Sequence, residues 1–574
     1  MDKIKKLRKL FETYSIDGYI VPKNDEFFGE YVDQRNDRLN YISSFTGSAG
    51  YAIILKKISY LFVDGRYTLQ AKNECNKNFK IIEIHKKKPS KILAKINTKI
   101  KIGFDPKLFS EANLINNFKA QNVSLVPIEQ NLVDGLWVRK PKSRNQEFFL
   151  LNSKFVGKTY KYKLDIVCKI LKKRRINKLL ISAPENLAWL LNIRGKDSKY
   201  SPIPNCHAIL DSNKKIAIIV NKNKINNKFK KYFKNTVNYI NPPNIIYYLK
   251  NLDRKNTFLI DKFSCSFLYK KLIEKKFRYE EKIDPIYFLK AKKNSVEISN
   301  SIKSHILDGA ALTKFIYWIK NNVKKLKITE ISAEKKLENF RKKSSKYKFP
   351  SFNTISGAGP NGAIVHYRAN NKTNRQIKKN DIYLCDSGGQ YHYGTTDVTR
   401  TLCFSKQSQK IKNIFTKVLK GHIGVVTHKL KKNTTGKNLD VVARAPLNRS
   451  GLNYAHGTGH GVGYFLNVHE GPQAISKFNQ VKLEEGMILS NEPGYYKTNS
   501  FGIRIENLIY MKKYKNKLKF ENLTLAPIEK DLINYKLLNI KEKKYLSEYH
   551  KKVFFTLSPF LNKKEKNWLK LVTN

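Results

Sequence analysis

Hydrophobic and polar positions follow two rhythms along the first part of the chain. Residues 2–14 carry apolar side chains at the three- and four-residue spacing of an amphipathic helix, whereas residues 17–22 form an apolar run of strand length. Both patterns recur up to a polar break at residues 139–147, which is rich in basic residues, serine and asparagine. The pattern therefore predicts a first α/β domain over residues 1–140.

The same mixture of patterns returns after the break. An amphipathic helix is expected over residues 161–173, and strand-length apolar runs follow at residues 178–183, 206–211, 215–220 and 256–261. These elements predict a second α/β domain over residues 147–288. No repeat of fixed period is visible in the sequence.

The pattern changes near residue 290. Helical spacing is sustained over residues 295–322 and 329–343, and strand-like stretches follow at residues 381–389, 395–404, 486–493 and 502–511. Long helices with an antiparallel sheet indicate an α+β unit over residues 290–574, with a C-terminal extension over about 512–574. We therefore expect a multidomain protein of mixed α/β and α+β class.

Composition narrows the choice of partners. The formal net charge is +65, but only 18 of the 111 basic residues are arginine, and lysine is spread evenly along the 574 residues. Such even enrichment is typical of genome composition, so nucleic acid is not expected as the primary partner. No apolar run reaches membrane-spanning length, and six cysteines without a C-x-x-C pair suit reduced thiols. We expect a cytoplasmic protein without a membrane partner.

Four acidic residues lie on or beside the strands of the third segment. Asp386 and Asp397 lie in two strand-like pieces joined by a glycine-rich connection, so a hairpin could bring them together. Glu492 lies in a loop, and Glu506 stands within a strand rich in isoleucine. Singly, each has an ordinary structural explanation as a turn former, a surface charge or a polar strand position. A carboxylate among apolar neighbours is nevertheless costly to bury unless it is paired or bound to a metal.

The stretch AHGTGHGVGYFLNVHEGP, residues 455–472, adds three histidines and five glycines. His456 and His460 have the spacing of the helical zinc motif H-E-x-x-H, but the surrounding glycines disfavour a helix. His469 lacks a second histidine at the required position, and the glycines do not fit G-x-G-x-x-G. We interpret the stretch as a glycine-lined loop that admits a substrate backbone, with histidines in different roles.

Four carboxylates and one imidazole in one pocket predict a metal centre. The carboxylates repel one another unless cations neutralise them, and an oxygen-rich set favours hard divalent ions such as Mn²⁺. Two ions about 3.5–4 Å apart would hold a hydroxide nucleophile and polarise a scissile carbonyl. The set therefore predicts metal-assisted hydrolysis.

Five motifs stand in order along the third segment: AIVHYRA (363–369), CDSGGQYHYGTTDVTRT (385–401), HGTGHGVGYFLNVHEGP (456–472), LSNEPGYY (489–496) and FGIRIENL (501–508). Together they resemble the catalytic domain of the cytosolic type of Xaa-Pro aminopeptidase (aminopeptidase P), of the pita-bread metallopeptidase family. Stretches such as FTGSAGYAIILKKISYLFVDGRYTLQA (45–71) extend the resemblance to the three-domain form along essentially the whole chain. It implies two creatinase-like α/β domains followed by a pita-bread catalytic domain.

The resemblance also implies the roles of the site residues. Two divalent ions, expected to be Mn²⁺, would be bound by five ligands: Asp386, Asp397, His460, Glu492 and Glu506. Asp397 and Glu506 would bridge the ions, and Glu492 would also transfer a proton. The implied catalytic histidines that do not bind metal are His366, His456 and His469. Arg504 would orient a bridging carboxylate or the hydroxyl of Tyr496, whereas Arg194 and Arg400 are expected to form structural ion pairs.

The implied reaction is hydrolysis of the bond between an N-terminal residue and a following proline, by a homodimer. Peptides with proline at position two are the expected substrates. One alternative is prolidase, which cleaves only Xaa-Pro dipeptides; the second domain and the C-terminal extension argue against it. A second alternative is a non-catalytic peptide- or histone-binding module of the same fold, which would lack the metal ligands that this chain retains.

Overall fold

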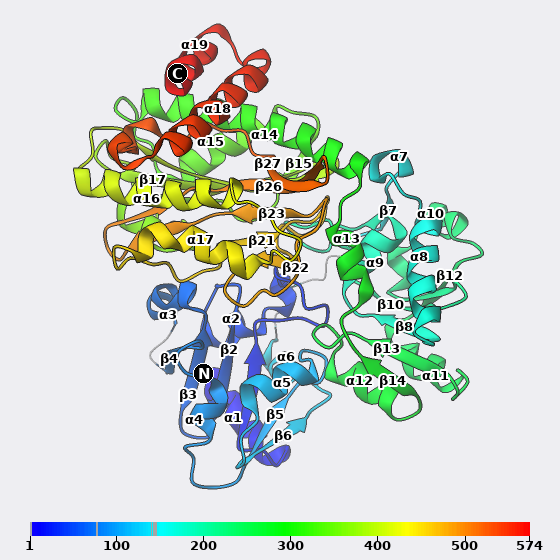
Figure 1. Cartoon of the computed structure of the whole chain (residues 1–574). Coiled ribbons are helices and arrows are strands. Elements are labelled where there is room, and N and C mark those ends of the chain that lie inside the picture. Colours follow the sequence, from blue (N-terminus) through cyan, green and yellow to red (C-terminus); the bar gives the residue numbers. More distant parts are fainter. Residues whose placement is uncertain (1–2, 76–77, 139, 142–145) are drawn as a thin grey trace. The chain divides into compact units, whose positions relative to one another are not determined.

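The structure is a computed structural model that describes residues 3–75, 78–138, 140–141 and 146–574 (Figure 1). The chain forms two compact units. The first comprises Met1–Ser153 and Lys158–Tyr287, and the second comprises Lys154–Gly157 and Phe288–Asn574. The expected polar break at residues 139–147 lies partly outside the described residues, because residues 139 and 142–145 are not among them.

The first sheet of the first unit has the strand order β4-β3-β2-β1-β5-β6. Its central strand is buried on both faces, because Tyr19 and Val21 pack into one hydrophobic core and Ile20 packs into another. The strands are β1 (Gly18–Pro22), β2 (Gly50–Leu55), β3 (Ser59–Val63), β4 (Phe79–Glu83), β5 (Ile100–Phe104) and β6 (Val123–Pro127). The helices are α1 (Lys3–Thr13), α2 (Arg38–Ser43), α3 (Thr68–Glu74), α4 (Pro89–Leu93), α5 (Glu111–Phe118) and α6 (Leu132–Leu136).

The second sheet of this unit, β12-β11-β10-β8-β13-β14, repeats the topology of the first. In the order given, the second and third strand pairs of each sheet are antiparallel, and the other three pairs are parallel. The strands are β8 (Lys178–Ile181), β10 (His207–Asp211), β11 (Ile216–Ile219), β12 (Val237–Ile240), β13 (Thr257–Ile260) and β14 (Arg278–Glu281). The helices that accompany these strands along the chain include α8 (Tyr160–Lys173), α9 (Pro184–Leu191), α10 (Asn227–Tyr232), α11 (Ile245–Lys250) and α12 (Phe267–Glu274). The unit therefore contains an internal structural repeat.

The second unit opens with two helices whose ends follow from their caps. Helix α14 (Ser295–Asn322) begins after Asn294, whose side chain forms a capping box with Glu297. Helix α15 (Glu330–Lys342) begins in the same way after Thr329. Helices α16 (Gln409–Val426) and α17 (Gly436–Asn448) follow later in the chain and lie side by side (Figure 1).

Short antiparallel sheets form the centre of the second unit. The largest has the order β22-β21-β23-β26-β27, and a three-stranded sheet has the order β16-β17-β20. Their strands are β16 (Ile355–Ala358), β17 (Ile382–Ser387), β20 (Val398–Cys403), β21 (Gly459–Gly461), β22 (Glu470–Ile475), β23 (Ile488–Asn491), β26 (Asn507–Tyr514) and β27 (Lys517–Asn522). Smaller sheets contain β15 (Tyr347–Pro350), β18 (Gly389–Tyr391) and β19 (Gly394–Thr395), or β24 (Gly494–Lys497) and β25 (Phe501–Arg504).

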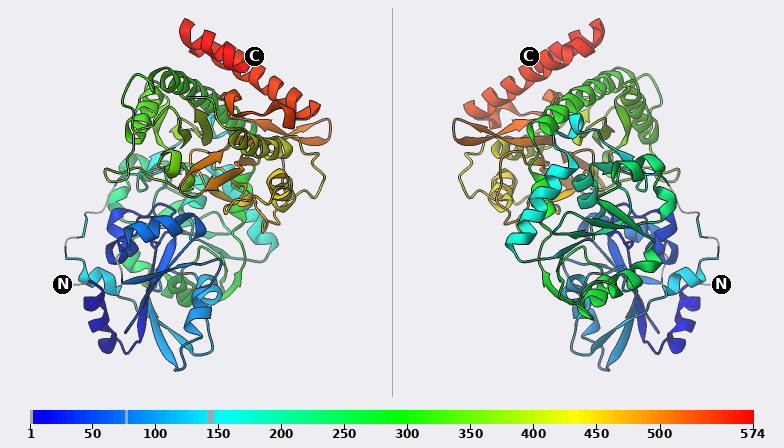
Figure 2. Two further views of the ribbon diagram at one scale, coloured as in Figure 1. Left: turned by 90° about the vertical axis from the view of Figure 1, so that its left-hand side faces the viewer. Right: turned by 90° about the vertical axis from the view of Figure 1, so that its right-hand side faces the viewer.

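The chain ends in two helices that pack on the second unit. Helix α18 (Ile540–Leu557) contacts α14 and α16, and α19 (Lys563–Thr573) contacts α14. Both views of Figure 2 show these helices (red) along the outer side of the unit. Leu546, Val553 and Leu557 of α18 join the apolar core that also holds Ile503 and Ile505. The C-terminal helices thus share a core with the strand that precedes Glu506.

No helix in the described part of the chain combines the length and the apolar character that crossing a membrane requires.

Candidate metal centre

Paired strands bring the first two acidic residues together. Strands β17 and β20 are antiparallel, with Asp386 of β17 opposite Thr399 of β20. Asp397 comes directly before β20, two residues ahead of Thr399, and so points to the same face of the strand. The carboxylates of Asp386 and Asp397 are both buried. The connection between the strands contains the small hairpin of β18 and β19.

Glu506 does not stand inside a strand, contrary to the prediction of one strand over residues 502–511. It lies in the break between β25 and β26. Its backbone N–H donates to the carbonyl of Thr399 (3.2 Å), and its Oε2 accepts a hydrogen bond from the Thr399 hydroxyl (2.7 Å). Glu506 is 1% exposed, and both its backbone N–H and its carboxylate are hydrogen-bonded to Thr399 of β20.

His460 and Glu492 reach the same place from the large sheet. His460 lies in β21, and Glu492 directly follows β23. Ser490 contacts both, since its hydroxyl accepts from the His460 backbone N–H (3.0 Å) and donates to Glu492 Oε1 (3.2 Å). His460 Nε2 lies 3.5 Å from Asp397 Oδ2 and 3.5 Å from Glu492 Oε1.

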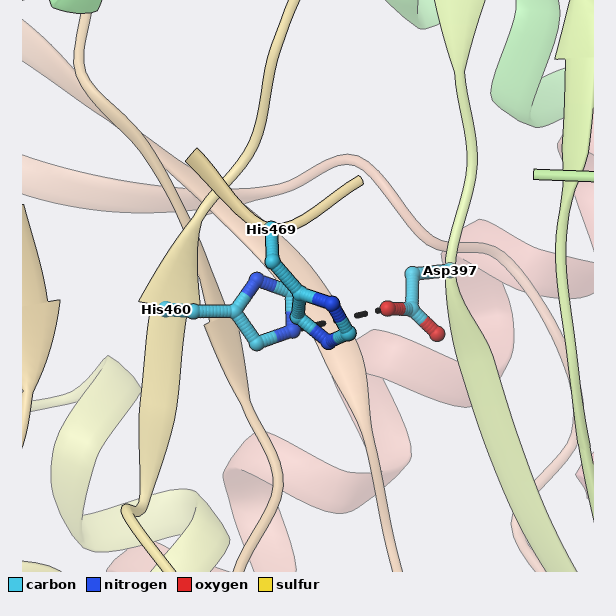
Figure 3. A group of neighbouring side chains, drawn as sticks. All are labelled: Asp397, His460 and His469. Atoms are coloured by element: carbon cyan, nitrogen blue, oxygen red, sulfur yellow. Dashed lines mark ion pairs between the residues drawn. The ribbon is translucent and has the colours of Figure 1, made fainter. Parts of the chain in front are cut away.

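The five expected ligands form one connected group. Potential ligand atoms lie within 4.8 Å of one another in three overlapping sets: Asp386 with Asp397 and Glu506, His460 with Glu492 and Glu506, and Asp397 with His460 and His469. Figure 3 shows the third set, in which the rings of His460 and His469 lie next to each other and the Nε2 of His460 points to Asp397.

The electrostatics of this group call for cations. Burial raises the pKa of Asp397 well above its usual range, and the charges of Asp386 and Glu492 raise it further. Burial and the neighbouring Asp397 likewise raise the pKa of Glu506 well above its usual range. Burial also raises the pKa of Glu492, although His460 opposes this rise. Several carboxylates this close cannot all be ionised unless positive charge is added among them.

Two local features fit divalent ions. Oδ1 of Asp386 and Oδ1 of Asp397 are buried, and neither has a hydrogen-bond partner among the residues that the structure describes. Nδ1 of His460 lies 2.9 Å from the carbonyl oxygen of Gly461. A proton on Nδ1 makes this a hydrogen bond and leaves the lone pair of Nε2 directed at the carboxylates, as in most metal-binding histidines. The donor set, mainly oxygen with one imidazole, suits hard divalent ions.

A chain of hydrogen bonds connects Asp386 to His456. Arg504 donates from Nη2 to Asp386 Oδ2 (2.6 Å) and from Nη1 to the Tyr496 hydroxyl (2.7 Å). The Tyr496 oxygen is in turn 2.8 Å from His456 Nε2. Burial raises the pKa of Tyr496 to about 12, so its hydroxyl stays protonated and can donate to His456. Arg504 thus contacts the Tyr496 hydroxyl that the sequence suggested, but its carboxylate partner is Asp386 and not one of the two expected bridges.

The other two expected histidines differ in position. His469 lies beside His460, with ring centroids 4.2 Å apart. His366 lies in the loop after the 3-10 helix Gly359–Ala363 and is half-buried. The catalytic roles of His366, His456 and His469 stay predictions.

Sequence reasoning missed two residues that support the ligands, Thr399 and Ser490. Besides binding Glu506, the Thr399 hydroxyl accepts a hydrogen bond from Arg504 Nε (3.0 Å). A signal for Thr399 was available, because it follows Asp397 by two residues on a strand and therefore shares its face. The same signal was available for Ser490, which precedes Glu492 by two residues; only its contact with His460, on a separate strand, carried no signal in the sequence.

Two glycines of the histidine-rich stretch, Gly459 and Gly461, allow the chain's own strands to pack closely. A Cβ on Gly459 would lie 2.0 Å from the carbonyl oxygen of Ser490, and one on Gly461 would lie 2.1 Å from that of Glu470. These glycines therefore allow neighbouring strands of the chain itself to approach closely. The expectation that the stretch makes room for a substrate backbone is wrong at these two positions.

Comparison with protein families divides the chain into four matched segments. The model of metallopeptidase family M24 matches residues 300–513, and that of the C-terminal region of this peptidase family matches residues 516–574. Two models of the creatinase/prolidase N-terminal domain match residues 3–136 and 139–297.

Curated relatives match the chain along its full length. Xaa-Pro aminopeptidase 1 of Dictyostelium discoideum is 36% identical, with 99% of this chain and 95% of the relative covered. The chain belongs to the Xaa-Pro aminopeptidases of metallopeptidase family M24. A probable Xaa-Pro aminopeptidase P of Laccaria bicolor is likewise 36% identical, with 98% of this chain and 91% of the relative covered. Membership of family M24 makes the protein a hydrolase.

Solved structures agree with this membership. The X-prolyl aminopeptidase of Caenorhabditis elegans, described as a cytosolic enzyme with a di-nuclear active site, superposes with a TM-score of 0.95 at 29% identity. It covers 100% of this chain, and 99% of its own chain is covered. A prolidase of Thermococcus sibiricus, 26% identical with a TM-score of 0.52, covers 65% of this chain. The predicted family and the predicted fold, two creatinase-like domains and a pita-bread domain, are confirmed.

Proposed function

We propose that the protein removes the N-terminal residue from peptides whose second residue is proline, using two divalent ions bound by Asp386, Asp397, His460, Glu492 and Glu506. One observation carries the proposal: three buried acidic side chains, Asp386, Asp397 and Glu506, and the partly buried Glu492 meet around one imidazole. The full-length likeness to proteins named Xaa-Pro aminopeptidases supports the choice of bond.

The contacts among the five side chains support the ligand assignment. Asp397 and Glu506 would be the bridges. Each belongs to two of the three overlapping sets, as His460 also does, but only a carboxylate has two oxygens with which to contact two ions. The donor atoms, mainly carboxylate oxygens, suit hard divalent ions, of which we propose Mn²⁺. Two bound ions supply activation of a water molecule and polarisation of the scissile carbonyl.

The chain itself must move the proton. The nitrogen of a peptide bond must be protonated before it can leave as an amine, and the nitrogen of an Xaa-Pro bond brings no hydrogen of its own. Burial raises the pKa of Glu492 above its usual value, which is the direction that a proton-accepting carboxylate requires. We infer that Glu492 takes a proton from the attacking water and delivers it to the prolyl nitrogen.

The histidines and Tyr496 orient the peptide. The Tyr496 hydroxyl, held by Arg504, fixes the ring of His456 through Nε2. We infer that His456, His469 and His366 form hydrogen bonds to the substrate and stabilise the charge that develops on the carbonyl oxygen.

The alternatives make different demands. A prolidase would act on dipeptides alone, and the curated relatives that cover the whole chain are named for aminopeptidase activity instead. A non-catalytic binding module would have no need for the buried carboxylates, which are costly to keep without cations.

We further infer a cytosolic homodimer. The six cysteines are all free thiols, and the nematode relative is described as cytosolic. The dimer rests on the family resemblance alone, and light scattering of the purified protein tests it.

The proposed activity is tested with paired peptides. Release of the first residue from Xaa-Pro-Xaa tripeptides and from Xaa-Pro dipeptides is measured by mass spectrometry, with added Mn²⁺ or with a chelator. The proposal expects cleavage of the tripeptides that the chelator abolishes and Mn²⁺ restores. Cleavage of dipeptides alone would instead make the protein a prolidase, and no metal-dependent cleavage would refute the proposal.

A further inference from the structure

Arg400 is a buried cation at the back of the metal centre. Its side chain is 1% exposed, and the guanidinium makes hydrogen bonds to five other residues and to the carbonyl of its neighbour Thr399. The other acceptors are the carbonyls of Glu506 (2.8 Å), Ala526 (2.9 Å) and Pro527 (3.0 Å), the side chain of Asn507 (2.9 Å) and the hydroxyl of Tyr549 (3.0 Å). The ion pair expected for Arg400 is absent among the described residues.

Burying a guanidinium without a carboxylate partner is costly. Desolvation lowers the pKa of Arg400, which is the sign of a charge that water would stabilise better. Carbonyl dipoles compensate only if their positions are fixed, because each hydrogen bond weakens steeply when its angle or length changes. The hydrogen bonds of Arg400 therefore restrict the positions of all the segments that supply its acceptors.

One of those acceptors belongs to a proposed bridging ligand. Glu506 lies in a break between strands, so strand pairing does not fix its carbonyl. The Thr399 hydroxyl donates to the Glu506 carboxylate on one face of β20, and Arg400 donates to the Glu506 backbone carbonyl on the opposite face. This division follows from strand geometry, since neighbouring residues of β20 point to opposite faces.

Tyr549 connects this arrangement to the C-terminal helices. It lies in α18 and is buried, and its hydroxyl contacts Arg400 Nη2 and the carbonyls of Ala526 (3.0 Å) and Thr524 (3.2 Å). The backbone N–H of Ala526 donates back to the Tyr549 oxygen (3.2 Å). A single hydroxyl thus joins α18, the segment 524–527 and Arg400.

We propose that Arg400 and Tyr549 are positioning residues, through which the C-terminal extension sets the place of Glu506 in the metal centre. Neither side chain touches the proposed ions. Their effect reaches the ions through the backbone of Glu506, and the inference rests on the ligand set proposed above.

The test compares two tyrosines of the same helix. Tyr549→Phe removes only the hydroxyl that meets Arg400. Tyr545→Phe is the matched control, because Tyr545 lies one turn earlier and its hydroxyl accepts from Asn522 (2.8 Å) instead. Mn²⁺ is titrated calorimetrically into the metal-free full-length proteins, and the melting temperature is measured before and after loading.

The inference expects wild type and Tyr545→Phe to bind two Mn²⁺ alike. Tyr549→Phe is expected to bind one of the two about tenfold more weakly, the lower end of the loss seen when outer partners of metal ligands are removed. Its kcat at low Mn²⁺ falls, and excess Mn²⁺ restores it with the KM for peptide unchanged. A purely structural role would not be rescued by metal.

A second variant covers the case in which Tyr549→Phe does not fold. Arg400→Lys keeps the charge but loses the planar fork, and the same weakening of one site is expected. If each of these two variants that folds binds both ions with wild-type affinity, the inference is overturned, and the ligand set is unaffected. Fewer than two ions in the wild type would overturn the ligand set itself, and this inference with it.

Discussion

The carboxylate of Asp386 is joined to the imidazole of His456 through two side chains, Arg504 and Tyr496. A change at the metal centre can therefore alter the orientation of a histidine that is proposed to face the substrate. Asp386 and His456, the two ends of this series of hydrogen bonds, belong to motifs about 70 positions apart in the sequence. This separation does not itself predict a contact. The connection depends on the guanidinium of Arg504, which can donate to two partners at once.

Tyr496→Phe breaks this chain without touching a proposed ligand. Removing a hydrogen-bond donor that contacts the reacting group lowers kcat by about 10²–10³. The Tyr496 hydroxyl acts only through His456, so its loss is expected to lower kcat less, by roughly tenfold. Mn²⁺ content should not change. Tyr495→Phe serves as the control, because adjacent residues of β24 point to opposite faces. Equal kcat for the two variants would contradict the proposed link.

A second buried cluster tests how the fold supports the histidine-rich stretch. Glu470 follows His469, and its carboxylate lies 2.9 Å from Lys290 Nζ and 3.2 Å from Lys293 Nζ. All three side chains are at most 2% exposed. Burial opposes ionisation of Glu470, but the two lysines together lower its pKa below the usual range.

Glu470→Gln removes the carboxylate that lies beside both buried ammonium groups. Breaking a buried ion pair in this way destabilises proteins by about 3–5 kcal/mol, so a clear fall in the melting temperature is expected. Glu484→Gln is the control, because the Glu484–Lys292 pair (2.7 Å) is 41% and 42% exposed and such pairs contribute about 0–1 kcal/mol. Calorimetry of both variants checks this. Equal melting temperatures would show that the cluster contributes no more than a surface pair.

At the scale of elements, helices were more predictable than strands. The sequence predicts a helix over residues 295–322, and α14 has these bounds, because a capping box and continuous amphipathic spacing mark it. The strand expected over residues 502–511 is instead two strands that pair with different partners, β24 and β23. An apolar run in the sequence predicts that a segment is buried, but it does not show where the segment stops pairing with one strand and begins to pair with another. The break matters because it places Glu506 at the centre of the site.

Helix α18 gives the molecule an acid-sensitive contact. His550 is buried, and its Nε2 accepts a hydrogen bond from the backbone N–H of Ile528 (3.1 Å), which requires a neutral ring. Burial lowers the pKa of His550 to about 3, from 6.5 for a free side chain. The unfolded chain therefore binds a proton more readily, and the contribution of His550 to stability is lost as the pH falls below 6.5 towards 3.

At pH 5 this loss amounts to about 2 kcal/mol, taking about 1.4 kcal/mol for each pH unit below 6.5. His550→Gln keeps an acceptor but cannot titrate. Its free energy of unfolding should therefore change less between pH 7 and pH 5 than that of the wild type, by about this amount. Denaturant unfolding at the two pH values measures the difference, and identical pH dependence in both proteins would contradict the assignment.

At the scale of the molecule, the chemistry of the site could be predicted better than its supports. The five expected ligands do lie together, because motifs preserve the identity of ligands that function requires. Arg400 could not be assigned correctly, since its partners are backbone carbonyls that any residue can supply. The repeated topology of the two N-terminal sheets was also invisible, because strand order depends on pairing rather than on a sequence period.

The central claim is that two divalent ions are bound by Asp386, Asp397, His460, Glu492 and Glu506. The most direct test is anomalous diffraction at the manganese absorption edge from crystals grown with Mn²⁺. The account predicts two anomalous peaks, both among these five side chains and with Asp397 and Glu506 between them. A single peak, or peaks outside this set, would contradict it.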